Sequence, residues 1–210
     1  MNSPKLLIEG FARFRELHFA QNDTLFRKLV EQGQTPNTLV IACCDSRVDP
    51  ALILDCEPGD LFVIRNVANL VPPSENQGHY HGTSAALEFG VQNLQVQHII
   101  VLGHAQCGGI QALMEGKMHK EDIFISEWMG IAETALKNVD RELQDASSEK
   151  RLRACEQQAI LVSLDNLMTF PWIRERVEQG SLTLHGWYFD IEHGELLGYS
   201  ATAQRFEVLH

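Results

Sequence analysis

The sequence predicts an α/β fold in which helices flank a mostly parallel central β-sheet. Short, continuous apolar runs rich in β-branched residues recur along the chain, which is typical of strands buried on both faces of a parallel sheet. Segments with helical spacing of apolar residues separate these runs, and this β-α alternation belongs to that fold class. We expect the 210 residues to form a single domain.

The N-terminal segment is predicted to be one long amphipathic helix. Apolar residues at three- to four-residue spacing run from Leu7 to Leu29, and Gly33 and Pro36 follow as helix-ending residues. A helix of about 25–30 residues is long for a globular domain, so we expect it to pack against a partner subunit. The domain would then comprise a helical arm at residues 1–33, an α/β core at 37–115, and C-terminal helices and strands at 120–210.

The remaining elements follow from the same patterns. Three strands are predicted, over Thr38–Cys43, 60–64 and 98–102, the third ending at Gly103. The expected helices are 50–55, 83–94, one that begins near Cys107, and then 121–139, 148–170 and 171–180. A β-hairpin of residues 181–191 and 196–201, turning at His193-Gly194, is predicted to end the fold.

Charge and composition exclude several classes of function. The chain has 17 Lys and Arg against 28 Asp and Glu, a formal charge of −11, which disfavours nucleic acid and anionic membrane surfaces as partners. The longest apolar runs are far shorter than the roughly 20 residues of a membrane-spanning helix. An odd count of five cysteines argues against a disulfide framework. We therefore expect a reduced, cytoplasmic compartment.

Two predicted strand ends carry the chemistry of the chain. The first has the sequence CCDSR, residues 43–47, and the second has GHAQCGG, residues 103–109. In open α/β sheets, ligands bind beyond the carboxyl ends of the strands. Cys43, His104 and Cys107 form a Cys₂His set, which is known for catalytic zinc with one position left open. The sequence thus predicts one zinc ion per chain.

The alternative is that these are buried structural cysteines, the commoner fate of a free thiol. Charged Asp45 and Arg47 beside Cys43 do not fit a plain apolar core, and this favours the metal site. A structural zinc normally has four protein ligands. Cys44 could be the fourth only by pointing to the same face as Cys43, whereas adjacent strand residues point to opposite faces. Three cysteines are therefore assigned to packing: Cys44, Cys56 and Cys155.

Asp45 has two alternative roles. Its carboxylate could ligate zinc as a fourth donor and close the site, or it could pair with Arg47 and accept a hydrogen bond from the attacking water. Arg47 favours the second role, because a guanidinium group can grip a carboxylate at two points. An ordinary surface ion pair is the third interpretation.

The ordered motifs CxDSR and GHxxCGG resemble those of the β-class carbonic anhydrases. The resemblance covers most of the chain, through four further segments: Gln34-Thr35-Pro36, 57–62, 65–69 and His185-Gly186-Trp187. It implies reversible hydration of CO₂ to bicarbonate by a zinc-bound hydroxide. Cys43, His104 and Cys107 would bind the zinc, and Asp45 and Arg47 would form the catalytic dyad.

The resemblance also implies a substrate pocket. Gln34 falls where plant-type members place a substrate-orienting glutamine contributed across a dimer interface. Phe62 and Val67 match residues that line the CO₂ pocket, and the backbone of Gly108 borders it. Phe89 stands where plant-type members often carry Tyr. The family assembles as homodimers or dimers of dimers, so we expect the same of this chain.

The bicarbonate-inhibited subtype of the family carries a Trp-Arg-Tyr triad. Arg65 matches that pattern, but Val40 and Phe189 replace the Trp and the Tyr, so the chain resembles the open subtype more. Two alternative functions remain. One is hydrolysis of CS₂ or COS, as in relatives of this fold, and the other is a zinc-binding or redox module without turnover. His79 and His81 could relay protons, although solvated loop histidines are the simpler interpretation.

Overall fold

The computed structural model describes residues 3–19, 24–75, 80–117 and 121–209. The chain divides between Thr35 and Pro36 into two compact units. The N-terminal unit holds two helices, α1 (Pro4–Phe19) and α2 (Thr24–Gln32), where one continuous helix was predicted. Residues 20–23 between them lie outside the described part of the chain. Aromatic rings join the two helices: Phe26 of α2 lies 5.5 Å from Phe14 and 5.0 Å from Phe19, measured between ring centroids.

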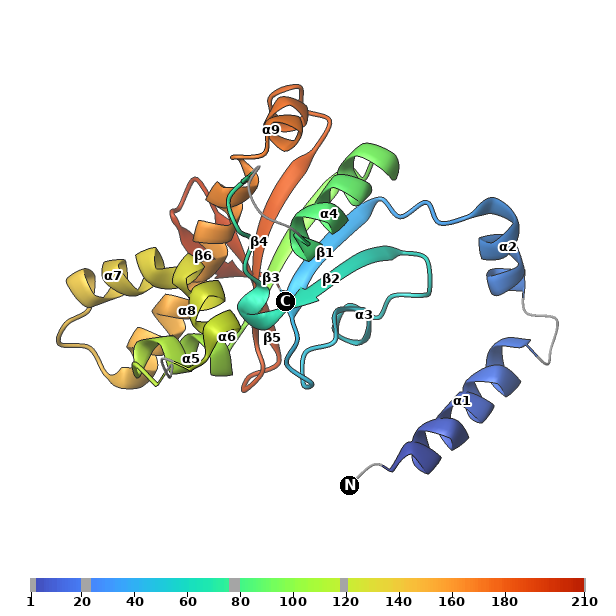
Figure 1. Ribbon diagram of the computed structural model, residues 1–210, viewed down its shortest axis with the longest axis horizontal. Coiled ribbons are helices and arrows are strands. Elements are labelled where there is room, and N and C mark those ends of the chain that lie inside the picture. Colours follow the sequence, from blue (N-terminus) through green and yellow to red (C-terminus); the bar gives the residue numbers. More distant parts are fainter. Residues whose placement is uncertain (1–2, 20–23, 76–79, 118–120, 210) are drawn as a thin grey trace. The chain divides into compact units, whose positions relative to one another are not determined.

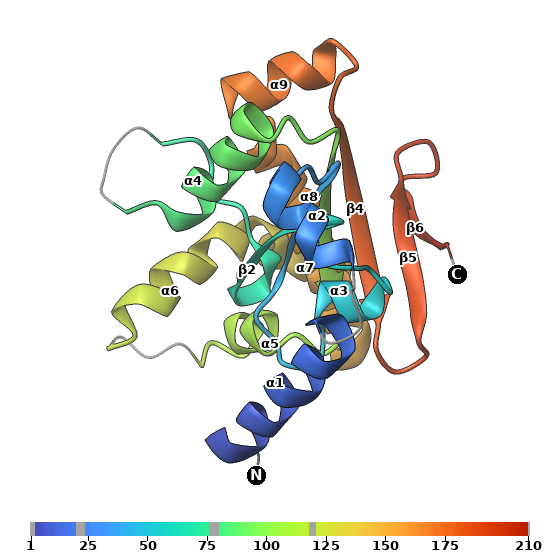
Figure 2. The same ribbon diagram turned by 90° about the vertical axis from the view of Figure 1, so that its right-hand side faces the viewer.

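The larger unit is built on a six-stranded mixed sheet with the order β2-β1-β3-β4-β5-β6. The strands are β1 (Thr38–Cys43), β2 (Leu61–Asn66), β3 (His98–His104), β4 (Thr183–Asp190), β5 (Glu195–Ser200) and β6 (Arg205–Val208). The first four in this list pair in parallel, and β5 and β6 continue the sheet antiparallel to β4. Figure 2 shows β5 and β6 at one edge of the sheet, beside β4. The mostly parallel sheet and the hairpin are confirmed.

The strands differ in detail from the predictions. The second strand, predicted over 60–64, covers Leu61–Asn66 as β2. The third strand does not end at Gly103 but continues through His104, because both residues remain in register with β4. The last strand, β6, was not predicted, since its four residues include two charged side chains that pair with each other, Arg205 and Glu207.

Helices cover the sheet in the larger unit. They are α3 (Pro50–Ile53), α4 (Gly82–Glu88), α5 (Gly108–Met114), α6 (Ile123–Met129), α7 (Glu133–Glu142), α8 (Ser148–Leu167) and α9 (Pro171–Glu178). The segments α5, α6, α7 and α8 lie together (Figure 1). Among the described residues, no helix combines the length and apolar character needed to cross a lipid bilayer.

Two predicted helices are interrupted. The one expected over 121–139 is divided into α6 and α7 by a 3₁₀ turn, η3 (Gly130–Ala132). The one expected over 83–94 changes after α4 into a π-helical turn, η2 (Phe89–Asn93). Gly90 lies in this turn, and a Cβ atom there would approach the Leu39 side chain of β1 to 2.5 Å. The close packing of this turn on the sheet therefore depends on glycine.

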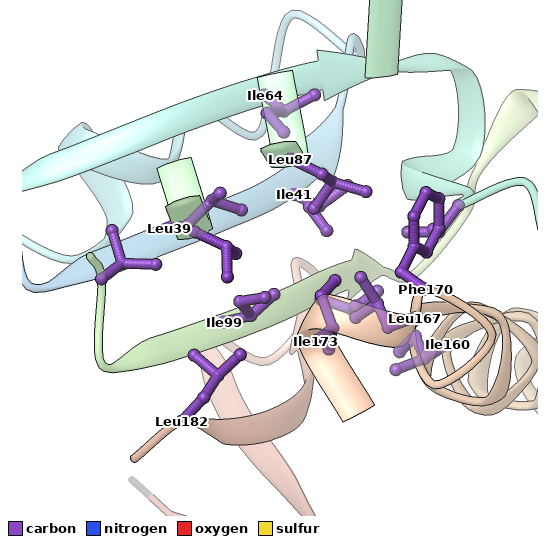
Figure 3. Packing of buried hydrophobic residues seen from close by; sticks show 14 of the residues in the cluster. Leu39, Ile41, Ile64, Leu87, Ile99, Ile160, Leu167, Phe170, Ile173 and Leu182 are labelled. Carbon is purple, nitrogen blue, oxygen red and sulfur yellow. The ribbon is translucent and has the colours of Figure 1, made fainter. Parts of the chain in front are cut away.

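The core confirms the expectation that β1 is buried on both faces. Leu39 and Ile41 point toward the side chains of α8 and α9, among them Ile160 and Ile173 (Figure 3). The alternate residues Val40 and Ala42 belong to a second apolar cluster with Ile100 and Leu102 of β3. Because both faces are apolar, the polar groups of this region are confined to the strand ends.

Candidate metal centre

Three potential metal ligands meet at the carboxyl end of the parallel strands. Cys43 is the last residue of β1, His104 is the last residue of β3, and Cys107 comes directly before α5. Because β1 and β3 are parallel neighbours, their carboxyl ends share one edge. The three ligand atoms lie within 4.8 Å of one another, and all three residues are buried. The predicted cluster is therefore present.

The donor set fits zinc. The Nδ1 atom of His104 lies 2.8 Å from the carbonyl oxygen of Ala105, which assigns the ring proton to Nδ1 and leaves a lone pair on Nε2. That Nε2 atom is buried and has no hydrogen-bond partner among the described residues. A buried, unpartnered imidazole nitrogen beside two thiols is the arrangement of a Cys₂His zinc site. The hydrogen bond to Ala105 fixes the orientation of the ring, as is typical of metal-binding histidines.

The electrostatics of the cluster favour a thiolate at Cys43. The hydrogen bond from Cys107 lowers the pKa of Cys43 to about 4, although burial acts in the opposite direction. The backbone N–H of Asp45 also donates to the Cys43 sulfur, at 3.4 Å. The hydrogen bond that the Cys107 thiol makes to Cys43, together with burial, raises the pKa of Cys107 above its ordinary value. The two sulfurs therefore share one proton, and metal binding would release it and leave both as thiolates.

Asp45 and Arg47 form a two-point ion pair beside the cluster. The Arg47 side chain donates from Nε to Oδ1 at 2.9 Å and from Nη2 to Oδ2 at 2.7 Å. The Arg47 backbone N–H donates to Oδ1 as well, at 3.0 Å. Nη2 also donates to the carbonyl oxygen of Gln106, next to Cys107, at 3.0 Å. The hydrogen bonds from Arg47 hold the pKa of the Asp45 carboxyl well below its ordinary value.

Arg65 clamps the backbone between Cys43 and Asp45. Its Nε atom donates to the carbonyl oxygen of Cys43 at 2.9 Å, and its Nη2 atom donates to that of Asp45 at 2.8 Å. Its Nη1 atom pairs with Asp49 at 2.9 Å. Sequence reasoning matched Arg65 to a family position but missed this role. The guanidinium group thus makes three hydrogen bonds within the chain, and Val40, at the Trp position of the triad, is buried.

The expected pocket residues fall into separate groups. A Cβ atom on Gly109 would lie 3.0 Å from Val67, so Val67 adjoins the backbone of residues 108 and 109 next to Cys107. Phe62 instead packs on Phe89, with 5.9 Å between ring centroids. In the sheet, Phe62 is opposite Leu39, whereas Asn66 is opposite Cys43. At about 3.3 Å per residue, Phe62 lies roughly 13 Å along β2 from the zinc end. Gln34 belongs to the N-terminal unit.

A strained loop follows β2 at the zinc end. Ala68 and Asn69 are buried and have left-handed backbone angles, with φ of 62° and 49°, which non-glycine residues seldom adopt. Trp128 of α6 donates from Nε1 to the carbonyl oxygen of Val67 at 2.8 Å. Ser163 of α8 accepts from the backbone N–H of Val71 at 3.2 Å. These contacts, which no sequence pattern predicted, hold the loop from distant helices.

Glu156 was also missed by sequence reasoning. It lies in the middle of α8, is 3% exposed, and accepts a hydrogen bond from the backbone N–H of Cys107 at 2.8 Å. A signal was present: Glu156 and Ile160 have helical spacing, followed by Ser163 and Leu167 on the same buried stripe.

The three remaining cysteines differ in burial. Cys155 is buried in the core, as predicted, and Cys56 is half-buried. The packing role assigned to Cys44 was wrong within this chain, because β1 ends at Cys43 and the Cys44 side chain is exposed. It lines a cavity with Val67 and Trp128. All five cysteines are free thiols. His79 lies outside the described residues.

Comparison with known proteins gives concordant matches. A family model described as carbonic anhydrase matches residues 38–196. The chain is 42% identical over 185 residues to β carbonic anhydrase 5, chloroplastic, of Arabidopsis thaliana, covering 87% of this chain and only 60% of that protein.

Two solved structures are similar over nearly the whole chain. The β-carbonic anhydrase CcaA superposes with a TM-score of 0.91 at 37% identity, covering 98% of this chain and 92% of that one. A structure from the report of two tetrameric β-carbonic anhydrases of the ascomycete Sordaria macrospora has a TM-score of 0.76 at 32% identity, covering 96% and 92%.

Proposed function

This chain belongs to the carbonic anhydrase family, in its β class, and we propose that it catalyses the reversible hydration of CO₂ to bicarbonate and a proton. The observation that carries this proposal is the two-point Asp45–Arg47 ion pair beside the Cys43–His104–Cys107 zinc site. When bound there, zinc supplies Lewis acidity, which lowers the pKa of a water ligand and makes a nucleophile available near neutral pH.

The ion pair gives the chain control over the nucleophile. The ionised Asp45 carboxylate can only accept hydrogen bonds, so it orients the O–H of the attacking water and turns a lone pair toward CO₂. Arg47 holds both carboxylate oxygens and so keeps them off the metal. If Asp45 became a fourth zinc ligand in a closed state, it would have to break at least one of these bonds. The geometry therefore favours the open arrangement.

The substrate pocket is proposed to form between two copies of the chain. Val67 and the Gly108 backbone supply the wall next to the zinc site, and CO₂ as an apolar molecule suits such a surface. Phe62 and Phe89 lie too far along the sheet to complete that wall within one chain. A second copy would contribute them together with Gln34. A homodimer or a dimer of dimers is supported by the tetrameric relatives and by exposed apolar residues along α1. These residues are Leu6, Leu7, Ile8, Phe11 and Leu17.

Bicarbonate titration tests the proposed open subtype. Arg65 is committed to Cys43, Asp45 and Asp49 by three hydrogen bonds, and Val40 and Phe189 offer a regulatory anion no hydrogen-bonding side chain. We expect CO₂ hydration at pH 7–8 to fall with rising bicarbonate only as ordinary product inhibition. A cooperative shut-off would show that the chain carries the inhibitory site after all.

A CO₂ hydration assay tests the activity itself. Zinc-loaded protein should accelerate the acidification of a buffered indicator solution by CO₂ in stopped-flow measurements. Parallel assays with CS₂ and COS should give far slower turnover. Turnover of CS₂ or COS without CO₂ hydration would assign the chain to the hydrolases, and no turnover at all would leave a zinc-binding module.

The five free thiols support a reducing compartment such as the cytoplasm.

A further inference from the structure

We propose that Glu156 positions the zinc ligand Cys107 by holding the backbone of the turn between His104 and Cys107. The inference rests on the zinc site, and on the proposed CO₂ chemistry only for a kinetic readout. The described hydrogen bonds of Glu156 include none to a ligand sulfur; it contacts the main chain of the ligand.

Glu156 is unusually buried for an acidic side chain. It is 3% exposed in the middle of α8, next to the buried Cys155 and one turn before Ile160. Burial raises the pKa of its carboxyl group above the ordinary value. A carboxyl group in such surroundings destabilises a fold unless its oxygens are hydrogen-bonded. A leucine at this core position would avoid the free-energy cost of burying a carboxyl group. The hydrogen bonds of Glu156 therefore indicate why a carboxyl group stands here.

The first contact is with the turn that separates two zinc ligands. Gln106 has a left-handed backbone with φ of 58°, and this reverses the chain between His104 and Cys107. Cys107 then stands at the N-cap of α5, where its own N–H has no acceptor within the helix. The Oε1 atom of Glu156 supplies that acceptor at 2.8 Å. The carboxyl group thereby fixes the backbone from which the Cys107 sulfur projects.

The second contact fixes the carboxyl group itself. Its Oε2 atom accepts a hydrogen bond from the hydroxyl of Tyr188 at 2.7 Å. Tyr188 is fully buried on β4 and stands opposite Gly103 of β3, one residue before the ligand His104. The guanidinium carbon of Arg153 lies 5.6 Å from the centre of the Tyr188 ring, and Arg153 pairs with Asp190. Glu156 is thus held between β4 and the Cys107 turn.

Two variants separate positioning from a merely structural role. Glu156→Asp keeps the charge but withdraws both oxygens by one carbon–carbon bond, so they cannot reach Cys107 and Tyr188 together. Glu156→Gln keeps the length: its carbonyl oxygen can accept from Cys107, while its amide donates to the Tyr188 oxygen. Cys155→Ala is the matched control, since Cys155 is the adjacent buried residue on α8. It shares an apolar cluster with Cys43 and Cys107, but none of the described hydrogen bonds joins it to a zinc ligand.

The readout is zinc affinity, measured by competition of the holoenzyme with a chromophoric chelator at one pH. We expect Glu156→Asp to bind zinc about 10–100-fold more weakly, as is common when the outer partner of a metal ligand is lost. Glu156→Gln and Cys155→Ala should stay close to wild type. Thermal unfolding of each zinc-loaded variant accompanies the titration, so a general loss of stability in Cys155→Ala is recorded separately.

Two outcomes would overturn the proposal. Equal zinc affinity in Glu156→Asp and Cys155→Ala would show that the Glu156 carboxyl group has a structural role only. A loss in Glu156→Gln with retention in Glu156→Asp would show that the charge matters and the reach does not. In zinc-saturated protein, we expect Glu156→Asp to lower kcat and Glu156→Gln to restore it. If wild-type protein fails to hydrate CO₂, the proposed function falls while the affinity comparison still decides the role of Glu156.

Discussion

Replacement of His104 by alanine is expected to abolish both zinc binding and CO₂ hydration. The wild-type chain should carry about one zinc ion, and the variant close to none after dialysis. The physical reason is that His104 contributes the only imidazole of the cluster and the only donor from β3. Two thiolates alone do not form a zinc site of this class. Mass-spectrometric metal analysis and stopped-flow CO₂ hydration measure the two losses on one sample.

Cys44→Ser is the control for this experiment. Cys44 is adjacent to the ligand Cys43 in the sequence, but it is exposed and outside the cluster. Its zinc content and activity should match wild type. A His104→Ala protein that keeps one zinc per chain and its activity would show that the metal centre has been placed on the wrong residues.

Asp45→Asn is expected to keep zinc and lose activity. None of the three ligand atoms is removed, so metal content should stay near one per chain. The amide keeps one acceptor oxygen, while its NH₂ group opposes an Arg47 donor and breaks the two-point ion pair. The side chain therefore no longer holds an acceptor in place for the water O–H group. Loss of such a positioned group typically lowers the rate by about 10²–10⁴-fold, and we expect kcat/KM to fall by that order.

The pH dependence sharpens this prediction. The Arg47 hydrogen bonds lower the pKa of Asp45, so the carboxylate is already ionised everywhere above the ordinary range of an aspartate. The loss in Asp45→Asn should therefore be the same at every pH between 6 and 9. By the same linkage, any stabilisation of the fold by this pair persists above that range and is lost only as the pH falls through the lowered pKa.

Asp140→Asn provides the matched substitution. Asp140 of α7 forms an ion pair with Arg151 of α8, and it belongs neither to the metal cluster nor to the described partners of Asp45 and Arg47. Its amide variant should retain the full rate of CO₂ hydration. If both variants lose activity to the same extent, the effect would come from general charge loss and the role of Asp45 would have to be abandoned.

The sequence predicted the structure best where the types of a few neighbouring side chains determine the local fold or the site. The run Thr38–Cys43 is apolar at every buried position, so its place inside a parallel sheet was predictable. Cys43, His104 and Cys107 were predictable because two thiols and an imidazole at the ends of parallel strands are typical of a metal site. Asp45 and Arg47 were predictable because they lie two residues apart in the chain.

What remained hidden depends on contacts between distant residues. Arg65 donates to Cys43 and Asp45 across the sheet, a relation that only the pairing of β1 with β2 creates. Glu156 looked like one more charged residue in a polar helix, because its partner is a backbone N–H of another element. The separation of Phe62 from Val67 likewise follows from strand register, which a match of residue types does not contain.

The left-handed loop after β2 bears on the order in which the chain folds and binds its metal. All three zinc ligands have been synthesised once the chain reaches residue 107, yet the loop beside Cys43 is held by Trp128 and Ser163, which follow much later. The outer neighbour of β3 is β4, whose first residue is Thr183. A nascent chain ending near residue 115 therefore holds every donor atom without the frame that aligns them. We therefore expect the metal to bind late in the maturation of this protein, after the C-terminal half has folded.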